Sequence, residues 1–201
     1  MELPPFQVSW DYRCPFARNI HEHLVTALKA GADWDVTFTP YSLSQVHVEE
    51  GEPSIWDVAA TEPERLAINA GVVVRDRFSD RFLDAHRALF EARHDKGEDI
   101  REREVVAGAL KSVGVDPEAV FTEIDTGWPD EAVRKAHEWA VDNHQMFGVP
   151  TFVVADEAAF VRIMQRPQGD SQLAITTIER VVKMITEHPE INELKHTSVP
   201  L

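Results

Sequence analysis

The chain has 201 residues, 43 % of them hydrophobic and 27 % charged, which is typical of a globular protein with one large domain or a core domain that carries an insertion. No apolar stretch approaches the roughly 20 residues that a membrane-spanning helix needs. The formal net charge of −15 at pH 7 opposes contact with nucleic-acid phosphates and anionic lipid head groups. We therefore expect no nucleic acid and no membrane among the partners.

Cysteine usage and the N-terminus together indicate the cellular compartment. Cys14 is the only cysteine, so the chain cannot form an internal disulfide. The first residues, MELPPFQVSWD, lack the basic segment followed by an apolar one that marks a signal peptide. These two features predict a reducing, cytoplasmic location.

The first 45 residues show a strand, a helix and a second strand. A period of two predicts strands in PFQVSWD and WDVTFTP, and a period of three to four predicts a helix between them, which ends at Gly31. The apolar positions of the three elements are Phe6, Val8 and Trp10; Ala17, Ile20, Leu24 and Leu28; and Trp34, Val36 and Phe38. This order is a βαβ unit, whose strands we expect to be parallel.

The middle of the chain shows helical patterns only. The predicted helices follow Ser79 as N-cap, cover roughly residues 100–113, begin at Asp116-Pro117, and run from Trp128-Pro129 to Gly148. Strand patterns return in PTFVVAD and AAFVRI, which a turn around Asp156-Glu157 joins as a hairpin. A last helix has its apolar stripe at Leu173, Ile178, Val181, Val182 and Ile185.

The order β-α-β, helical block, α-β-β-α predicts an α/β fold interrupted by an all-helical insertion. We place the α/β domain at residues 1–45 and 128–190, the helical insertion at 46–127 and a C-terminal tail at 191–201.

Cys14 stands where the first strand ends and the first helix begins. Unpaired amides at a helix N-terminus favour an anion, so this placement predicts a thiol pKa below that of a free cysteine, with Arg13 and Arg18 nearby in sequence. A small buried hydrophobic residue is the alternative interpretation of a lone cysteine. DYRCPFA has the form of a C-x-x-C redox motif in which Ala17 replaces the second cysteine, and we expect Ala17 to point into the core.

A second motif, FGVPTFVV, places Val149-Pro150 between a helix and a strand. With DYRCPFA, the helical insertion, the hairpin and the last helix, it resembles the DsbA-type proteins of the thioredoxin fold over nearly the whole chain. The resemblance implies a thioredoxin fold, a cis bond before Pro150, and one site that contains the catalytic Cys14 with Pro15, Phe16 and Val149-Pro150. The peptide groups of Val149 would pair with a bound thiol or peptide, like an added strand.

Within that family the chain is most similar to cytosolic members that depend on a low-molecular-weight thiol. These include actinobacterial mycothiol-dependent nitroreductases and, more distantly, FrnE-type proteins and kappa-class glutathione transferases. The similarity lies in WD before the cysteine loop, RPQGDSQ before the last helix and the tail INELKHTSVP. It implies mycothiol or glutathione as a cosubstrate, with no tightly bound cofactor, and it departs at Ala17, where dithiol members have cysteine.

Other candidate residues have two interpretations each. Asp170 and Ser171 either cap the last helix or hold the polar end of a thiol cosubstrate. His86 is either a core histidine or part of a cleft wall, and Trp10 and Tyr12 either line a site for a flat substrate or belong to the core. The spacing of the histidines matches no metal site, so we expect no metal.

These observations leave three functions open. The first is a thiol oxidoreductase in which Cys14 forms a mixed disulfide with a small-molecule or disulfide substrate, and an external thiol resolves it. The second is a thiol-dependent transferase or isomerase in which Cys14 only holds or polarises a cofactor thiol. The third is a catalytically inactive binding protein. A homodimer is a further expectation.

Overall fold

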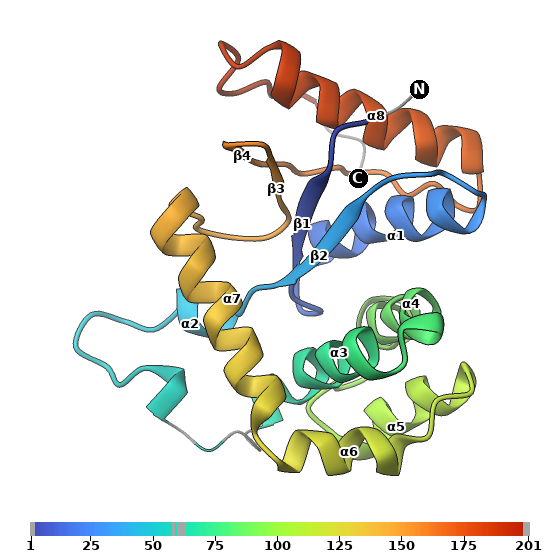
Figure 1. Ribbon diagram of the computed structural model, residues 1–201, viewed down its shortest axis with the longest axis vertical. Helices are drawn as coiled ribbons and strands as arrows, with labels where there is room; N and C mark the ends of the chain where they lie inside the picture. The colour runs from blue at the N-terminus through green and yellow to red at the C-terminus, as the bar shows by residue number, and fades with distance from the viewer. Residues whose placement is uncertain (1–2, 58, 60–62, 199–201) are drawn as a thin grey trace.

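A four-stranded sheet forms the centre of one half of the molecule in the computed structural model, which describes residues 3–57, 59 and 63–198 (Figure 1). Its strands are β1 (Phe6–Trp10), β2 (Val36–Pro40), β3 (Thr151–Val154) and β4 (Glu157–Phe160), in the order β2-β1-β3-β4. The β1–β2 pair is parallel, which confirms the βαβ unit, and the β1–β3 and β3–β4 pairs are antiparallel.

The helices surround this sheet and build a second half beside it. They are α1 (Pro15–Lys29), α2 (Leu43–Val46), α3 (Leu66–Arg77), α4 (Phe82–His94), α5 (Arg103–Ser112), α6 (Pro117–Asp125), α7 (Trp128–His144) and α8 (Ser171–Glu187). In Figure 1, α1 and α8 pack together beside the sheet, while α3 to α6 form the helical block below it. The mixed α/β fold with a helical insertion is therefore the predicted one.

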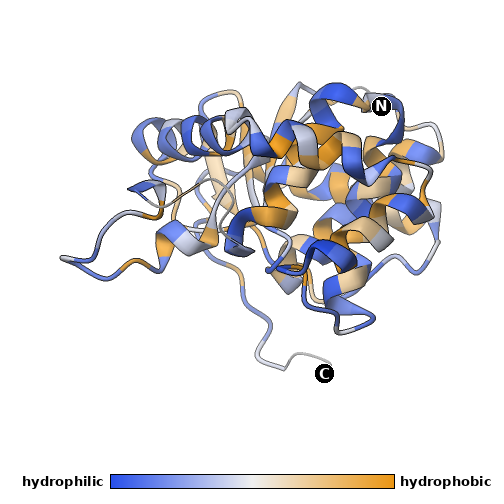
Figure 2. Ribbon diagram, turned by 90° about the horizontal axis from the view of Figure 1, so that it is seen from below, coloured by the Kyte–Doolittle hydropathy of each residue, from blue (hydrophilic) through white to orange (hydrophobic). Residues whose placement is uncertain are grey.

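Apolar residues of the helical block lie mostly between its helices, as the hydropathy colouring of Figure 2 shows. α3, which the sequence patterns did not reveal, lies at its centre, and Leu66 to Val74 are all buried. A helix that is buried on every side has no polar face, so it has no amphipathic period to detect. α7 contacts both β2 and α3, and the domain boundaries at residues 45 and 128 remain predictions.

Two predicted helix ends differ from the structure. α4 begins at Phe82 with Arg81 as its N-cap residue, and Ser79 instead opens a single 3₁₀ turn. α7 ends at His144, whereas we expected it to run to Gly148, and the next residue, Gln145, takes the left-handed conformation. Glycine is only the commonest residue in that conformation, so a glycine further along the chain did not mark this end.

The apolar stripe of α8 begins one residue later than predicted. Leu173 has an exposed fraction of 42 %, whereas Ala174, Ile178, Val182 and Ile185 are buried. The first turn of α8 therefore turns an apolar side chain outward.

The helical block and the cysteine loop touch closely at Gly71 of α3. A Cβ atom added there would lie 2.4 Å from the hydroxyl oxygen of Tyr12, whose side chain is buried. Only glycine therefore lets α3 approach the loop that leads to Cys14.

We predict that Gly71→Ala lowers the free energy of unfolding by about 1–3 kcal/mol, because the rigid, buried Tyr12 ring cannot move aside without repacking. Gly108→Ala is the matched control. A Cβ atom at Gly108, in the interior of α5, would meet no described atom within 4 Å. That variant should gain about 0.5–1 kcal/mol from helix propensity. Urea unfolding of both variants tests the prediction, and an unchanged or raised stability of Gly71→Ala would contradict it.

Candidate active site

Cys14 is the N-cap residue of α1, as the sequence predicts, and it is buried with an exposed fraction of 7 %. Its thiol donates to the carbonyl oxygen of Val149 over 3.2 Å, and the amide of Ala17 donates to its sulfur over 3.4 Å. The Val149–Pro150 peptide bond is cis. The structure thus joins the two sequence motifs, 135 residues apart, at one thiol.

The predicted lowering of the Cys14 pKa is wrong. Burial raises the pKa of this thiol above its ordinary value, and the amides of Ala17 and Phe16 offset only part of the effect. The contact with the Val149 carbonyl acts in the same direction as burial, because a neutral thiol can donate to that oxygen whereas a thiolate 3.2 Å away would be repelled by it. The helix N-terminus is present, but the thiol also faces an acceptor that sequence order cannot reveal.

The two arginines that flank Cys14 in sequence have carboxylate partners elsewhere. Arg13 pairs with Asp11 and Glu64, and Arg18 pairs with Asp95. The charges of these two arginines are therefore paired with carboxylates and do not give the expected stabilisation of a Cys14 thiolate. The cation that lowers the Cys14 pKa is instead Arg162, although burial and the nearby amides have larger effects.

Arg162 follows β4, and sequence reasoning gave it no role. Its guanidinium carbon lies 5.2 Å from the centroid of the Phe16 ring and 5.8 Å from that of the Phe160 ring. Phe160 in turn lies 5.2 Å from Phe147, measured between ring centroids. Phe147, Phe160 and Arg162 are exposed and Phe16 is half-buried. We call these four residues the aromatic–arginine surface. No period or motif connects them, because they come from three separate segments of the chain.

Asp11 holds the cysteine loop in place, and it too was missed as a separate residue. Its backbone carbonyl accepts from the amide of Cys14, and its carboxylate accepts from the amides of Arg13 and Leu43 at 2.9 and 2.8 Å. An ionised carboxylate that accepts backbone N–H groups fixes their geometry strongly. Its position in the WD pair before the cysteine loop was the only available signal.

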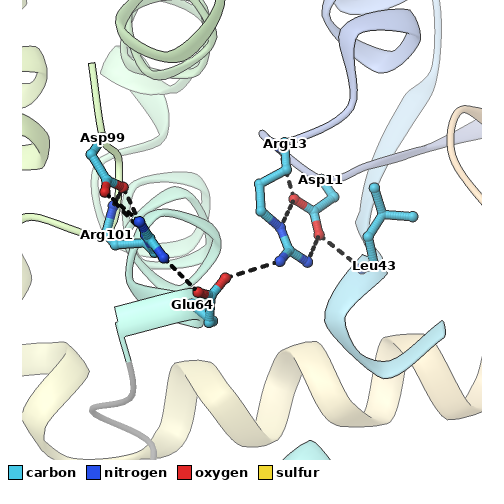
Figure 3. Close-up of polar contacts among 6 residues, drawn as sticks. All are labelled: Asp11, Arg13, Leu43, Glu64, Asp99 and Arg101. Atoms are coloured by element: carbon cyan, nitrogen blue, oxygen red, sulfur yellow. Dashed lines mark hydrogen bonds and ion pairs between the residues drawn. The ribbon is translucent and has the colours of Figure 1, made fainter. Parts of the chain in front are cut away.

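A chain of charges continues from Asp11 to the helical block, as Figure 3 shows. Arg13 bridges Asp11 and Glu64, and Arg101 bridges Glu64 and Asp99, with Glu64–arginine distances of 3.1 Å. Ion pairs between exposed side chains add little to stability, because water and salt screen them. The outer pairs therefore orient the loop against the helical block more than they stabilise the fold.

Trp10, Tyr12 and His86 are buried, which agrees with the core interpretation of each. Their exposed fractions are 0, 1 and 0 %. The Trp10 and His86 rings lie edge to face at 5.3 Å, and so do those of Tyr12 and His86. None of the three is accessible to a substrate, so they support the cysteine loop from behind.

A buried hydrogen-bonded chain runs from Tyr12 through His86 and His21 to Ser9. The Tyr12 hydroxyl lies 2.8 Å from Nδ1 of His86, Nε2 of His86 lies 3.0 Å from Nδ1 of His21, and Nε2 of His21 lies 3.1 Å from the Ser9 carbonyl oxygen. A carbonyl only accepts, so Nε2 of His21 must donate to it. Nδ1 of His21 then accepts from Nε2 of His86, and Nδ1 of His86 accepts from the Tyr12 hydroxyl. The chain is satisfied with both histidines neutral.

Burial keeps these histidines neutral. It lowers the pKa of His21 to about 4 and the pKa of His86 well below its usual value, where the neighbouring His21 adds to the effect. A proton on either ring would place a charge among buried apolar groups, and this desolvation opposes protonation of both histidines.

Asp170 caps α8, since its carboxylate accepts from the Leu173 amide at 2.9 Å. Ser171 is the first residue of the helix, and both side chains are exposed. Capping is therefore observed, while a role of the two residues in holding a thiol stays a prediction. Pro15 is exposed beside Cys14, whereas Pro150 is buried.

Residues 3–57, 59 and 63–198 contain no group of three or more His, Cys, Asp or Glu side chains arranged to hold a metal ion. Within the same residues, no helix combines the length and the apolar composition needed to cross a bilayer.

Comparisons with known proteins agree on the fold. The family model described as DSBA-like thioredoxin domain matches residues 7–168. The solved structure of MdbA, a thiol-disulfide oxidoreductase from Actinomyces oris, is similar with a TM-score of 0.61 at 20 % identity, covering 87 % of this chain and 81 % of that one. A comparison with curated proteins gave no match.

Two further solved structures show the same similarity. The oxidoreductase NmDsbA1 from N. meningitidis gives a TM-score of 0.58 at 14 % identity, with 94 % of this chain and 87 % of that one covered. DsbA from Pseudomonas aeruginosa gives 0.56 at 21 % identity, with coverage of 88 % and 83 %. At these identities the likeness concerns the fold.

We predict that the Cys14 thiol titrates above the ordinary range of a free cysteine, because burial and the Val149 carbonyl both favour the neutral form. The measurement is the rate of alkylation by iodoacetamide against pH, followed by mass spectrometry. A midpoint below the roughly 8.5 of a free cysteine would contradict the raised pKa.

We also predict that acid destabilises the protein through its buried histidines. In the unfolded chain a histidine binds a proton near pH 6.5, whereas His21 in the fold does so only at about 4. As pH falls through this window the unfolded state gains the proton first. The free energy of unfolding should therefore drop by up to about 1.4 kcal/mol per pH unit for each such histidine.

Urea unfolding at roughly pH 7.5 and pH 5.5 measures that loss. His21→Gln should reduce the pH dependence by about one proton, since glutamine does not titrate. The control is His47→Gln, because His47 is exposed. Equal pH dependence in wild type and His21→Gln would count against the prediction.

Proposed function

The chain belongs to the family of DSBA-like thioredoxin domains, and we propose that it is a thiol oxidoreductase with one active cysteine, Cys14. The observation that supports this function most is the contact of the Cys14 thiol with the carbonyl that precedes the cis Pro150. It places the one sulfur that can form a disulfide next to backbone groups able to bind an extended thiol compound. We further propose a reducing, cytoplasmic setting, which the single cysteine favours.

The reaction begins when the Cys14 thiol loses its proton to solvent. The thiolate attacks a disulfide, its S–S bond breaks, a Cys14 mixed disulfide forms and one thiolate leaves. Loss of the thiol proton also frees the Val149 carbonyl, which can then accept an N–H group of the bound compound. Because the pKa of Cys14 is raised, little thiolate is present before a substrate binds, so substrate binding has to assist deprotonation.

Resolution of the mixed disulfide needs a second thiol from outside the chain. Ala17 is fully buried at the place of the second C-x-x-C cysteine, with its amide against the Cys14 sulfur. The chain has no other cysteine, so an external thiolate must attack the mixed disulfide, release the bound thiol as a new disulfide and restore Cys14. We propose a low-molecular-weight thiol of the mycothiol or glutathione type, in line with the similarity to thiol-dependent members such as mycothiol-dependent nitroreductases.

The experiment adds glutathione disulfide and follows the protein by intact mass. The wild-type protein should accumulate an adduct of one glutathione that persists until a thiol is added, and Cys14→Ser should form none. Ala17→Cys should lose the adduct and gain an intramolecular disulfide, because a second sulfur beside Cys14 attacks at high effective concentration. Free-thiol titration before and after oxidation checks the last result.

Each other outcome favours one of the alternatives. A wild-type Cys14 that reacts with no disulfide, although the protein is folded, would identify a binding protein that kept the fold. Thiol-dependent turnover that survives in Cys14→Ser would indicate a transferase or isomerase in which residue 14 only polarises a bound thiol, a role that a hydroxyl can fill.

A further inference from the structure

We propose that Arg162 binds the carboxylate of the molecule whose sulfur reacts with Cys14, so that the site selects acidic thiols and disulfides. The inference rests on the proposed function, since it concerns the compounds that reach Cys14. Its support is the aromatic–arginine surface, formed by Phe16, Phe147, Phe160 and Arg162, of which Phe16 stands in the first turn of the helix that Cys14 caps.

The guanidinium of Arg162 is held by rings and not by a carboxylate. It lies 5.2 Å from Phe16 and 5.8 Å from Phe160, measured to the ring centroids. Stacking on aromatic faces fixes the plane of an arginine side chain and leaves its N–H groups directed outward along the edge. An exposed guanidinium edge of this kind matches the two oxygens of a carboxylate.

Arg162 differs in this respect from the other arginines around the cysteine loop. Arg13 pairs with Asp11, Arg18 pairs with Asp95, and Arg166 pairs with both Glu22 and Asp95. For Arg162, no hydrogen bond or ion pair to another described residue is found. The protein carries a net charge of −15, so carboxylates were abundant as partners and none is used here.

The position of Arg162 relative to Cys14 makes its charge useful to the reaction. Phe16 stands two residues after Cys14 in the first turn of α1, and Phe160 lies within van der Waals reach of a Cβ atom added at Gly148, beside Val149. The positive charge of Arg162 favours a lower pKa of the Cys14 thiol, although burial and the amides of Ala17 and Phe16 have larger effects. A disulfide with a carboxylate near its sulfur can therefore meet Arg162 and Cys14 together.

The assisted step is the formation of the mixed disulfide. The Cys14 thiol gives its proton to solvent and the thiolate attacks one sulfur of an acidic disulfide. The S–S bond breaks, the Cys14 mixed disulfide forms and the acidic thiolate leaves, so the attacked disulfide supplies the oxidising equivalents. Arg162 takes part in no bond. It raises the local concentration of the anionic disulfide and orients it.

The test compares three disulfides that differ in charge: glutathione disulfide, the neutral 2-hydroxyethyl disulfide and the cationic cystamine. The rate of adduct formation on Cys14 is measured by intact mass for wild type, Arg162→Gln and Arg162→Lys. Arg180→Gln is the matched control, because it removes the same charge from an exposed position on α8. The reactions are run at low and high salt.

Arg162→Gln should slow the reaction with glutathione disulfide about three- to ten-fold, as expected for a partly exposed charge-assisted pair. The rate with the neutral disulfide should change less than two-fold, and the rate with cystamine should not fall. High salt should reduce the preference of the wild-type protein for glutathione disulfide. Arg162→Lys should recover part of the rate because it keeps the charge without the planar edge. Arg180→Gln should behave as wild type.

Equal effects of Arg162→Gln on all three disulfides, or equal effects of Arg180→Gln and Arg162→Gln, would overturn the proposal. So would a wild-type rate that does not depend on the charge of the disulfide, a result that favours an uncharged thiol such as mycothiol. In each of these cases Cys14 still reacts, and the proposed function stands. Failure of all three disulfides to react with the wild-type protein would instead reject the proposed function.

Discussion

The hydrogen bond from the Cys14 thiol to the Val149 carbonyl is the contact on which the site depends. It connects the start of α1 with the turn before β3, and thereby brings both halves of the thioredoxin core to one sulfur. Burial raises the pKa of this thiol, and the bond favours the same neutral form because a carbonyl accepts only from the protonated thiol. In the proposed function, binding of a reaction partner at Val149 and activation of Cys14 would therefore be coupled through a single oxygen atom.

Support for this contact comes from behind the cysteine loop. Asp11 fixes the loop backbone with its carboxylate, and Tyr12 anchors it to the core through His86 and His21. Gly71 allows α3 to press against Tyr12, so the helical block contributes directly to the position of the thiol. The helical insertion thus acts as a rigid backing for the reactive loop, besides adding to the core.

Charge around the site is arranged unevenly. Most arginines near the cysteine loop are neutralised by carboxylates, and those pairs bind segments of the fold to one another. Arg162 stands out because it lies over the aromatic rings of Phe16 and Phe160. In a chain with one cysteine, every partner in the proposed reaction comes from outside. An arginine that recognises those partners would compensate for the missing second cysteine by improving the delivery of the external thiol.

Local patterns in the sequence predicted the βαβ unit, the hairpin, most helices and the helix starts at Cys14, Asp116 and Asp170. These features depend on near neighbours along the chain, where period, capping and turn chemistry operate. The family resemblance predicted that the two motifs form one site. The buried α3, the direction of the Cys14 pKa and the place of Arg162 were decided only by the tertiary structure. Each depends on burial or on contacts between distant segments, and the free energy of a charge or a thiol is set by the atoms around it, which sequence order does not specify.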